Sequence, residues 1–230
     1  PFEILRFEKP ISRKRALRIL TAGGITVFST ATRPNWETDA IPVRIPIRKG
    51  LLGYKLLLVR ANDADKFSSI KKAEQLKKFR VGGGQQWSSS LAMKHLGFKV
   101  YGGTEYEPLF AMLDAKRFDY FPRGVNEIFQ EYDMRKDKFP NMVIEKNLSI
   151  YLPLPTYFFV SPLKPELAKR VQEGLLSMVK DGTLDKMFLQ YHEQALKRAN
   201  LGSRHIIHLK NHSLSDETPF RRKEFWYHPQ

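Results

Sequence analysis

The sequence contains no cysteine among its 230 residues, and this absence excludes several kinds of chemistry. Without thiols the chain has no disulfide framework, no cysteine nucleophile, and no zinc or iron–sulfur site built on cysteine. The absence is compatible with an oxidising compartment, in which stray thiols are a liability, but it does not establish one. The class of small proteins stapled by disulfides is therefore excluded.

Long hydrophobic runs are also missing. The strongest run, residues 56–59, is bounded by Lys55 and Arg60 and is far shorter than the roughly 18 apolar residues that a membrane-spanning helix needs. The sequence starts at Pro1 without a charged and apolar leader. We therefore expect any targeting segment to have been removed or never to have been present.

Negative charge is scarce, with 24 acidic residues against 39 lysines and arginines and a formal net charge of +15. Such an excess suits a nucleic-acid surface, attraction to anionic lipid, a pocket for acidic ligands, or scattered surface charge without a specific role. The hydrophobic fraction of 42% is enough for a real core, which excludes a disordered chain. We expect most of the charge excess to be spread over helix faces and the C-terminal tail.

Strands and helices alternate between residues 80 and 134, which is the pattern of a parallel sheet with crossover helices. The last thirty or so residues lose periodicity, and we expect a tail wrapped over the surface. A helix capped by Ser12 and stopped at Gly23 is also predicted. The further expected strands are 2–7, 25–29, 54–60, 80–84, 99–101, 118–121 and 156–160, and the further expected helices are 68–79, 91–96, 107–116, 124–134, 165–180 and 183–197.

A glycine-rich turn at 82–84 joins a predicted strand to a predicted helix. Backbone N–H groups and the positive end of the helix dipole at such a turn can hold a carboxylate or a phosphate. The alternative is an ordinary turn with a serine cap. The turn lacks the Gly-Lys-Ser/Thr ending of nucleotide-binding loops. Its candidate ligand-binding residues are Trp87, Ser88, Ser89 and Ser90.

A second candidate group follows the predicted strand 25–29. Arginines at a strand end can clamp a carboxylate with two parallel hydrogen bonds, while threonine hydroxyls and a tryptophan supply orientation and an apolar wall. For any single arginine the alternative is solvated surface charge. The candidates are Thr30, Thr32, Arg33, Trp36 and Arg44.

The predicted strand 118–121 leads through Pro122 directly to Arg123 and Gly124. The carboxyl ends of parallel strands are where α/β sheets bind ligands, so Arg123 is a third candidate. Tyr120 and Phe121 belong more naturally to the core.

Signals for catalysis or for a metal are weak. No Gly-x-Ser-x-Gly motif is present. His205, His208 and His212 could be drawn as metal ligands, but histidines in a polar tail are more often solvated or capping. We therefore predict no catalytic residue, no metal and no cofactor.

The order of these pieces is more specific than any one of them. The segments "LDAKRFDYFPRG" (113–124) and "PELAKRVQEGLLSMVKDGTLDKMFLQYH" (165–192) are the clearest, and the ending Asp181-Gly182-Thr183 with Met187 and Tyr191 is typical. Over roughly residues 10–195 the chain resembles the bacterial extracellular solute-binding proteins of family 3. These are the type 2 periplasmic binding proteins of polar amino-acid ABC transporters.

This resemblance implies an α/β fold, a two-lobed clamshell in which each lobe is a mixed, mostly parallel sheet flanked by helices. Lobe 1 would comprise 1–58 and the return helices 155–200, with the family's opening strand and helix missing. Lobe 2 would comprise 59–154, and 201–230 would form the surface tail. Extended crossovers are expected near 56–60 and 152–158.

The resemblance also implies a ligand between the lobes, with an arginine of lobe 1 on its carboxylate. Arg33 or Arg44 would take that role, Ser88, Ser89 and Ser90 would supply the helix end, and Trp87 a wall. Many members carry an aspartate for the ligand's amino group near the position of Arg123. This sequence has no acid there, which favours a more acidic ligand or one without an amine.

The resulting hypothesis is a non-enzymatic periplasmic protein that binds a small polar or anionic solute and closes for delivery to an ABC transporter permease. A ligand-sensing domain with a signalling partner is an alternative. A dehydratase-type enzyme on the same fold, with Glu107 or Glu127 as acid or base, is another. Binding of nucleic acid through the net charge is a weaker alternative, and we expect a monomer without a nucleic-acid partner.

Overall fold

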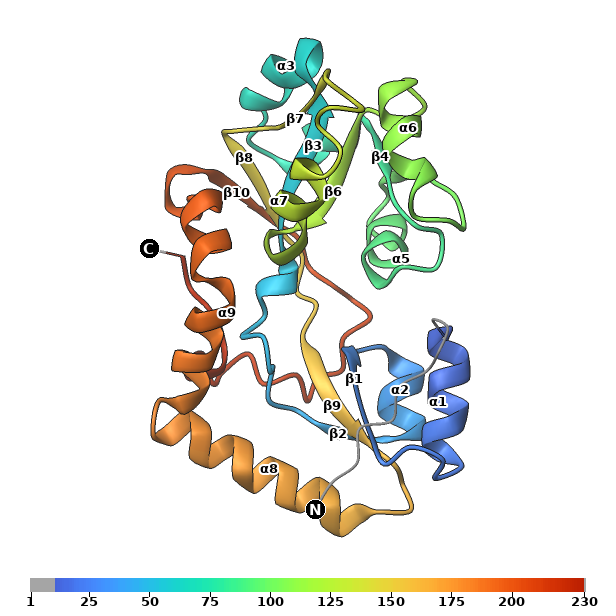
Figure 1. Cartoon of the computed structure of the whole chain (residues 1–230), viewed down its shortest axis with the longest axis vertical. Coiled ribbons are helices and arrows are strands. Elements are labelled where there is room, and N and C mark those ends of the chain that lie inside the picture. The colour runs from blue at the N-terminus through green and yellow to red at the C-terminus, as the bar shows by residue number, and fades with distance from the viewer. Residues whose placement is uncertain (1–10, 230) are drawn as a thin grey trace. The chain divides into compact units, whose positions relative to one another are not determined.

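The computed structural model describes residues 11–229, so the strand expected at 2–7 lies outside the described residues. The chain forms two compact units. Unit 1 comprises the residues up to Ile47 together with Thr156–Lys186 and Ser213–Trp226. Unit 2 comprises Arg48–Pro155, Met187–His212 and the residues from Tyr227 on. Figure 1 shows the elements of each unit along the chain.

The divisions near the expected limits at residues 58 and 200 fall elsewhere, whereas the expected limit at 154 lies one residue from the division after Pro155. The first falls at Ile47 because the whole strand 54–60 pairs within the sheet of unit 2. The last helix divides after Lys186, since Phe188 packs in a core cluster of unit 2. Part of the expected surface tail belongs to unit 1, where Phe225 and Trp226 are buried.

Unit 1 is built on an antiparallel sheet with the order β1-β9-β2. These strands are β1 (Val27–Ala31), β9 (Thr156–Val160) and β2 (Ile41–Val43). Strand β9 begins and ends as predicted, because its threonine, aromatic and valine residues suit a pleated and buried surface. Among the described residues, the sheet of unit 1 therefore has no parallel strand pair, and the parallel pairs lie in unit 2.

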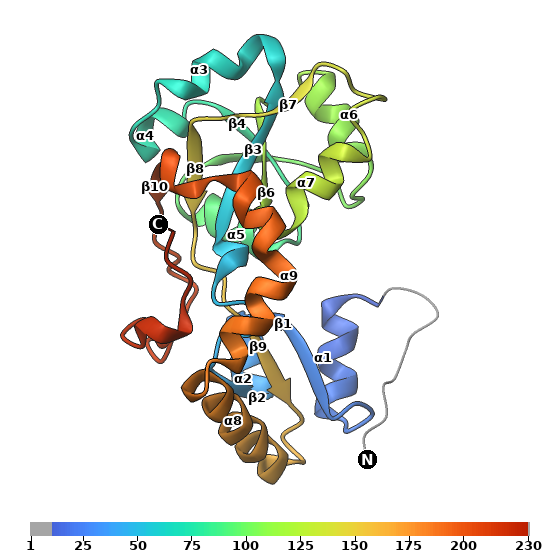
Figure 2. The ribbon, with the colours of Figure 1, turned by 60° about the vertical axis from the view of Figure 1, so that its left-hand side comes forward.

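The two faces of β9 bury different clusters of unit 1. Tyr157 and Phe159 point to one face and pack with Trp36 and with helix α1 (Arg13–Thr21). Val160 and the partly buried Phe158 belong to the other cluster, which includes residues of helix α8 (Pro165–Lys180). This alternation follows from the two-residue period of a strand. Figure 2 shows α1 and α8 with the strands of this unit.

Side chains cap two helices by hydrogen bonds, and the cap predicted at Ser12 is one of them. The Oγ atom of Ser12 accepts a hydrogen bond from the N–H of Arg15 at 3.3 Å, which satisfies one of the free donors at the start of α1. The carboxylate of Asp181 accepts from the N–H of Thr183 at 2.8 Å, where helix α9 (Thr183–Ala199) begins. Gly182, between the two helices, has a φ of 77°, a conformation that favours glycine.

Unit 2 contains a mixed sheet with the order β10-β8-β3-β6-β4-β5, and β7 also pairs with β3. Neighbours β10 and β8, β4 and β6, and β4 and β5 are parallel, whereas β3 is antiparallel to β6, β7 and β8. Strand β10 was not predicted from the sequence. The strands are β3 (Tyr54–Arg60), β4 (Arg80–Gly82), β5 (Lys99–Tyr101), β6 (Tyr120–Gly124), β7 (Met142–Ile144), β8 (Leu148–Tyr151) and β10 (His205–His208).

Strand β3 lies at the centre of unit 2 and is buried along its whole length. Leu56 and Leu58 belong to one core cluster, and Leu57 and Val59 to another. The first cluster draws on α6, α7 and α9, and the second on α3, α4 and α5. The α-helices of this unit besides α9 are α3 (Ala64–Ser68), α4 (Ala73–Leu76), α5 (Ser88–His95), α6 (Pro108–Asp114) and α7 (Val125–Asp133).

Two glycines give a matched test of this packing. A Cβ atom added at Gly102 would lie 1.6 Å from the carbonyl oxygen of Gly83, whereas one added at Gly174, inside α8, would meet nothing within 4 Å. We expect Gly102→Ala to lower the free energy of unfolding by several kcal/mol. Gly174→Ala should raise it by about 1 kcal/mol, because alanine is the better helix former. Urea unfolding measures both, and equal effects in the two variants would contradict the close approach at Gly102.

Candidate functional site

Two candidate residues of unit 1, Thr32 and Arg44, bind one carboxylate, that of Glu37 on helix α2 (Pro34–Asp39). Thr32 donates a hydrogen bond from Oγ1 to this carboxylate, and Arg44 donates to it from Nε and Nη2 at 3.3 and 3.0 Å. Arg44 also forms an ion pair with Glu217 at 2.6 Å. The guanidinium of Arg44 is therefore held by two carboxylates within its own unit.

Two of the expected ligand contacts in unit 1 belong to its core. Trp36 is only 1% exposed, stacks on Phe28 with ring centroids 5.4 Å apart, and meets Phe159 edge to face at 5.2 Å. It is therefore a core residue and not an apolar wall for a ligand. Thr30 is 7% exposed and pairs with Tyr157 in the sheet. Both residues were expected in a binding loop because the sequence did not reveal that β1 extends to Ala31 or that α2 contains Trp36.

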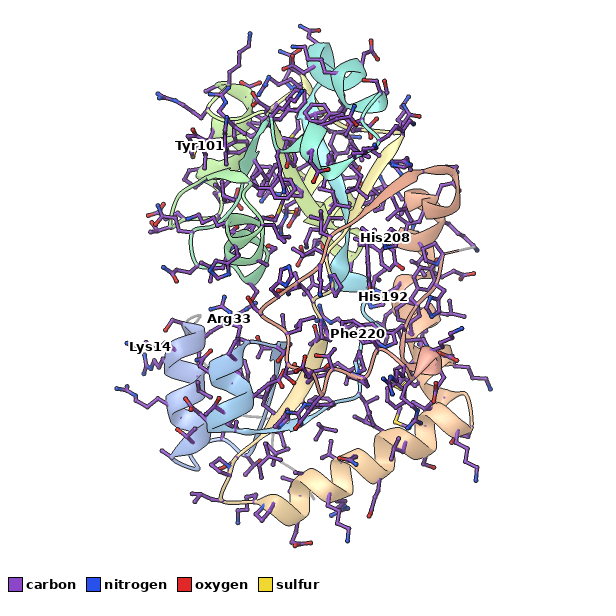
Figure 3. The ribbon with its side chains drawn as sticks, turned by 180° about the vertical axis from the view of Figure 1, so that it is seen from behind. Lys14, Arg33, Tyr101, His192, His208 and Phe220 are labelled. Atoms are coloured by element: carbon purple, nitrogen blue, oxygen red, sulfur yellow. The ribbon has the colours of Figure 1, made fainter. Side chains whose placement is uncertain are left out.

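Arg33 lies at the junction of β1 and α2, as the residue that precedes Pro34 at the start of the helix. Its backbone is extended, with a φ of −151°, as expected for a residue that precedes proline. The side chain is half-buried, and this burial lowers the pKa of its guanidinium. Figure 3 labels Arg33 in its place beside α2.

The glycine turn of unit 2 is tightly packed. A Cβ atom at Gly82 would lie 2.2 Å from the ring of Phe118, and one at Gly83 would lie 2.4 Å from Oγ of Ser90. At Gly84 the nearest atom would be Nε1 of Trp87, at 2.4 Å. The three glycines therefore let the backbone approach its neighbours and bring the chain from β4 to the start of α5.

Helix α5 starts at Ser88, three residues before the predicted start at 91. The N-cap is Trp87, with φ −76° and ψ 140°, and its side chain makes no capping hydrogen bond. The sequence analysis treated the serines as the cap, whereas Ser88, Ser89 and Ser90 form the first helical turn. Ser90 is buried. The first N–H groups of a helix have no partner within it, so this turn can bind a carboxylate.

Arg123 is 8% exposed and is surrounded by partners within unit 2. It donates to both carboxylate oxygens of Glu131, from Nε at 2.6 Å and from Nη2 at 2.5 Å. Glu127 lies 3.0 Å from Nη2. The rings of Trp87, Phe121 and Tyr106 surround the guanidinium, with centroids 4.6, 5.2 and 5.6 Å from Cζ. Arg123 thus has two carboxylate partners and is no open anion clamp.

The partners of Arg123 were not identified from the sequence. Glu127 and Glu131 are one helical turn apart on α7, a spacing that places both on the same side of a helix. That spacing was the available signal, because Arg123 lies directly before the same helix. Tyr106 offers no such signal, since it comes from the loop before α6. Its phenol is half-buried and hydrogen-bonded to Glu131, and both raise its pKa.

A second buried cation, Lys55, lies beside this group. It is 4% exposed, and its ammonium donates to the carbonyl oxygen of Leu52 at 3.0 Å. Burial lowers its pKa to about 8, while the negative charge of Glu127 acts in the opposite direction. Two cations and two carboxylates therefore share one small region of the protein.

A basic hollow lies elsewhere on unit 2. It has a volume of about 630 Å³, and its lining includes Arg80, Lys116 and Arg117 but no carboxylate. Tyr101, which is 46% exposed on strand β5, also lines it (Figure 3). Arg80 is ion-paired with Asp119 at 2.9 Å. Part of the positive charge therefore lies together in this hollow, whereas the sequence analysis expected it to be spread over helix faces and the tail.

The alternative chemistries receive little geometric support within the described residues. No group of three or more His, Cys, Asp or Glu side chains there could hold a metal ion. His205 contacts the carbonyl oxygen of Lys71, and His208 packs edge to face on Tyr151. Glu107 is ion-paired with Arg135, as Glu127 is with Arg123. Over the same residues, the helices are too short or too polar to cross a bilayer.

No protein-family model and no curated protein sequence matches the chain. Solved structures do match it. The putative binding component of an ABC transporter from Wolinella succinogenes, complexed with lysine, is 14% identical with a TM-score of 0.61, over 80% of this chain and 77% of that one. An ancestral arginine-binding protein bound to arginine is 21% identical with a TM-score of 0.56, over 80% and 78%. An ancestral amino-acid-binding protein, a precursor of cyclohexadienyl dehydratase, is 19% identical with a TM-score of 0.56, over 80% and 76%.

These matches identify the fold as that of the type 2 periplasmic binding proteins, and they confirm the α/β architecture expected from the sequence. The similar structures are amino-acid-binding proteins and binding components of ABC transporters. At these identities the likeness concerns the fold.

The lowered pKa of Lys55 predicts a pH dependence of stability. Between pH 8 and the ordinary lysine value of 10.5, the unfolded chain binds more protons at this site than the folded chain does. The contribution of Lys55 to the free energy of unfolding therefore rises with pH. We expect wild type to gain about 2 kcal/mol relative to Lys55→Met between pH 7.5 and 9.5. Urea unfolding at both pH values measures this, and the exposed Lys146→Met is the control. A constant difference between wild type and Lys55→Met would contradict it.

Proposed function

We propose that this protein is a non-enzymatic solute-binding protein that captures a small polar solute carrying a carboxylate. The observation that carries the proposal is the fold, which is shared with proteins solved with bound arginine, glutamine or lysine. An amino-acid-like or simple carboxylate solute fits that group. We further propose a periplasmic location and delivery of the solute to the permease of an ABC transporter.

In unit 2 we assign the solute's carboxylate to the first turn of α5. The helix has eight residues, its N-cap residue Trp87 makes no side-chain capping hydrogen bond, and the dipole of such a helix attracts an anion to its first turn. Ser88 and Ser89 are partly exposed there and can add hydroxyl hydrogen bonds. Trp87, directly before them, is also partly exposed and offers an apolar surface.

In unit 1 we assign a ligand contact to Arg33 because of its position in the fold. Arg33 stands at the end of β1 and at the start of α2, and an arginine there can bind a carboxylate by two parallel hydrogen bonds. Thr32 is committed to Glu37 and supports the loop.

We propose that the protein has no enzymatic activity because the two carboxylates considered as a general acid or base are each bound to an arginine. Glu127 forms an ion pair with Arg123 at 3.0 Å, and Glu107 forms one with Arg135. A general acid or base must instead be free to exchange a proton with the substrate. The fold alone does not require catalysis, since the similar structures are binding proteins.

A thermal-shift screen tests the proposed function. The panel contains the common amino acids, dicarboxylates and small phosphates, each with a matched salt control. A solute present at about 100 times its dissociation constant should stabilise the folded chain by about 2.7 kcal/mol. No shift with any amino acid or carboxylate would refute the proposal, and a shift with phosphates alone would replace its ligand class.

A pair of variants tests the α5 site. Ser88→Pro removes one N–H group at the first helical position, where proline is well tolerated and Trp87 before it is already extended. Ser88→Ala removes only the hydroxyl. We expect Ser88→Pro to weaken binding of the solute found in the screen about tenfold or more. Ser88→Ala should have the smaller effect.

Isothermal titration calorimetry measures both affinities, and circular dichroism checks that the helix is retained. Unchanged affinity in Ser88→Pro would place the carboxylate elsewhere.

A further inference from the structure

The surroundings of Arg123 have the features of a binding site for a planar cation. Three aromatic rings, from Trp87, Phe121 and Tyr106, lie within 6 Å of its Cζ atom. Aromatic faces at this distance attract a guanidinium through the ring quadrupole. We refer to these three rings, together with Glu127 and Glu131, as the guanidinium cage.

The acidic side of the cage matches the donor geometry of a guanidinium. Glu131 accepts from Nε at 2.6 Å and from Nη2 at 2.5 Å, so one carboxylate takes two parallel hydrogen bonds. Glu127 adds a second negative charge at 3.0 Å. A single ion pair would be enough to neutralise Arg123. The second carboxylate and the three rings instead reproduce a complete recognition site for a guanidinium ligand.

We propose that the guanidinium cage is a cation-binding site that the chain fills with its own Arg123, and that Arg123 thereby excludes cationic ligands from this face of Trp87. Its role in selectivity rests on the proposed function, which places the solute beside Trp87. Arg123 is then a specificity-determining residue. A solute with a guanidinium or ammonium side chain must compete with Arg123 for the guanidinium cage. Because Arg123 belongs to the same chain as the cage, its effective concentration there is far higher than that of a free solute.

Removal of Arg123 exposes the cage to free ligands. Without this residue, the remaining nearby cations are each bound elsewhere: the ammonium of Lys55 to the carbonyl oxygen of Leu52, and Arg135 to Glu107. The vacated space is lined by rings and bears excess negative charge. A small planar cation of matching shape, such as methylguanidinium, fits this vacancy.

Chemical rescue tests the proposal on the full chain. Arg123→Ala is expected to melt several degrees below wild type. Methylguanidinium at 10 mM should raise the melting temperature of Arg123→Ala by several degrees more than the same concentration of sodium chloride. Wild type should show no difference between the two salts. Equal responses of Arg123→Ala and wild type would overturn the proposal.

Two further variants control this experiment. The double variant Arg123→Ala with Glu131→Gln should lose the rescue, because the carboxylate that binds two nitrogens is gone. Arg198→Ala is the matched control, since Arg198 pairs with Asp133 and lies over the single ring of Phe129, with 41% of its side chain exposed. It should gain no response to methylguanidinium, and a rescue equal to that of Arg123→Ala would overturn the specificity of the cage. If Arg123→Ala does not fold, Arg123→Gln takes its place with the same expected direction.

The outcomes separate this inference from the proposed function. Rescue by methylguanidinium without any solute in the wild-type screen would support the cage and refute the solute-binding proposal. A solute found in the screen without rescue would do the reverse. If both hold, titration of Arg123→Ala with L-arginine should show an affinity at least tenfold above that of wild type. An unchanged affinity for L-arginine would overturn the role of Arg123 in selectivity.

Discussion

Burial of a single strand on both faces is the constraint from which each unit is built. In unit 2 that strand is β3, whose seven residues are all buried and whose odd and even positions enter different clusters. In unit 1 it is β9, with Tyr157 and Phe159 on one side and Val160 on the other. Such a strand buries apolar side chains on both of its faces, and the helices that cover each face pack against those side chains. Arg33 follows β1 and Arg123 lies on β6, which are neighbours of β9 and β3, whereas the first turn of α5 follows β4, one strand further from β3.

Several buried or half-buried arginines have partners nearby in the fold that balance their charge. Arg60 is 7% exposed, and it donates to the carbonyl oxygens of Leu113 and Phe118 and to the carboxylate of Asp63. Arg44 and Arg123 each have two carboxylates within their own unit. A buried charge without such partners would cost several kcal/mol. The net charge of +15 therefore says little about these residues.

The elements that could be predicted are those whose signal is local. Strands β3 and β9 and helix α8 begin and end where expected, because a run of apolar or aromatic residues or a long amphipathic period marks them. Strand β10 was missed because its residues read as polar tail, and only pairing with β8, more than fifty residues away, makes them a strand. Helix α2 was missed because it has only six residues.

The features of the candidate site likewise fall into those with a local signal in the sequence and those that depend on contacts across the fold. The glycine turn and the first turn of α5 could be inferred, since the sequence places both next to a strand end. The burial of Trp36 and the partners of Arg44 and Arg123 depend on contacts across the fold, in part with segments far away in the sequence. Tertiary contacts therefore decided which polar residues remain available to a ligand.

The chain passes from one unit to the other at residues 47–48, 155–156, 186–187, 212–213 and 226–227. Unit 1 is thus assembled from three separated segments, and Phe225 and Trp226 in the last of them are buried in its core. On the ribosome, the long segment 48–155 emerges well before the residues that complete unit 1. The stretch 11–47 must then wait for its partners while residues 48–155 are made, with its apolar residues open to chaperones and to premature association.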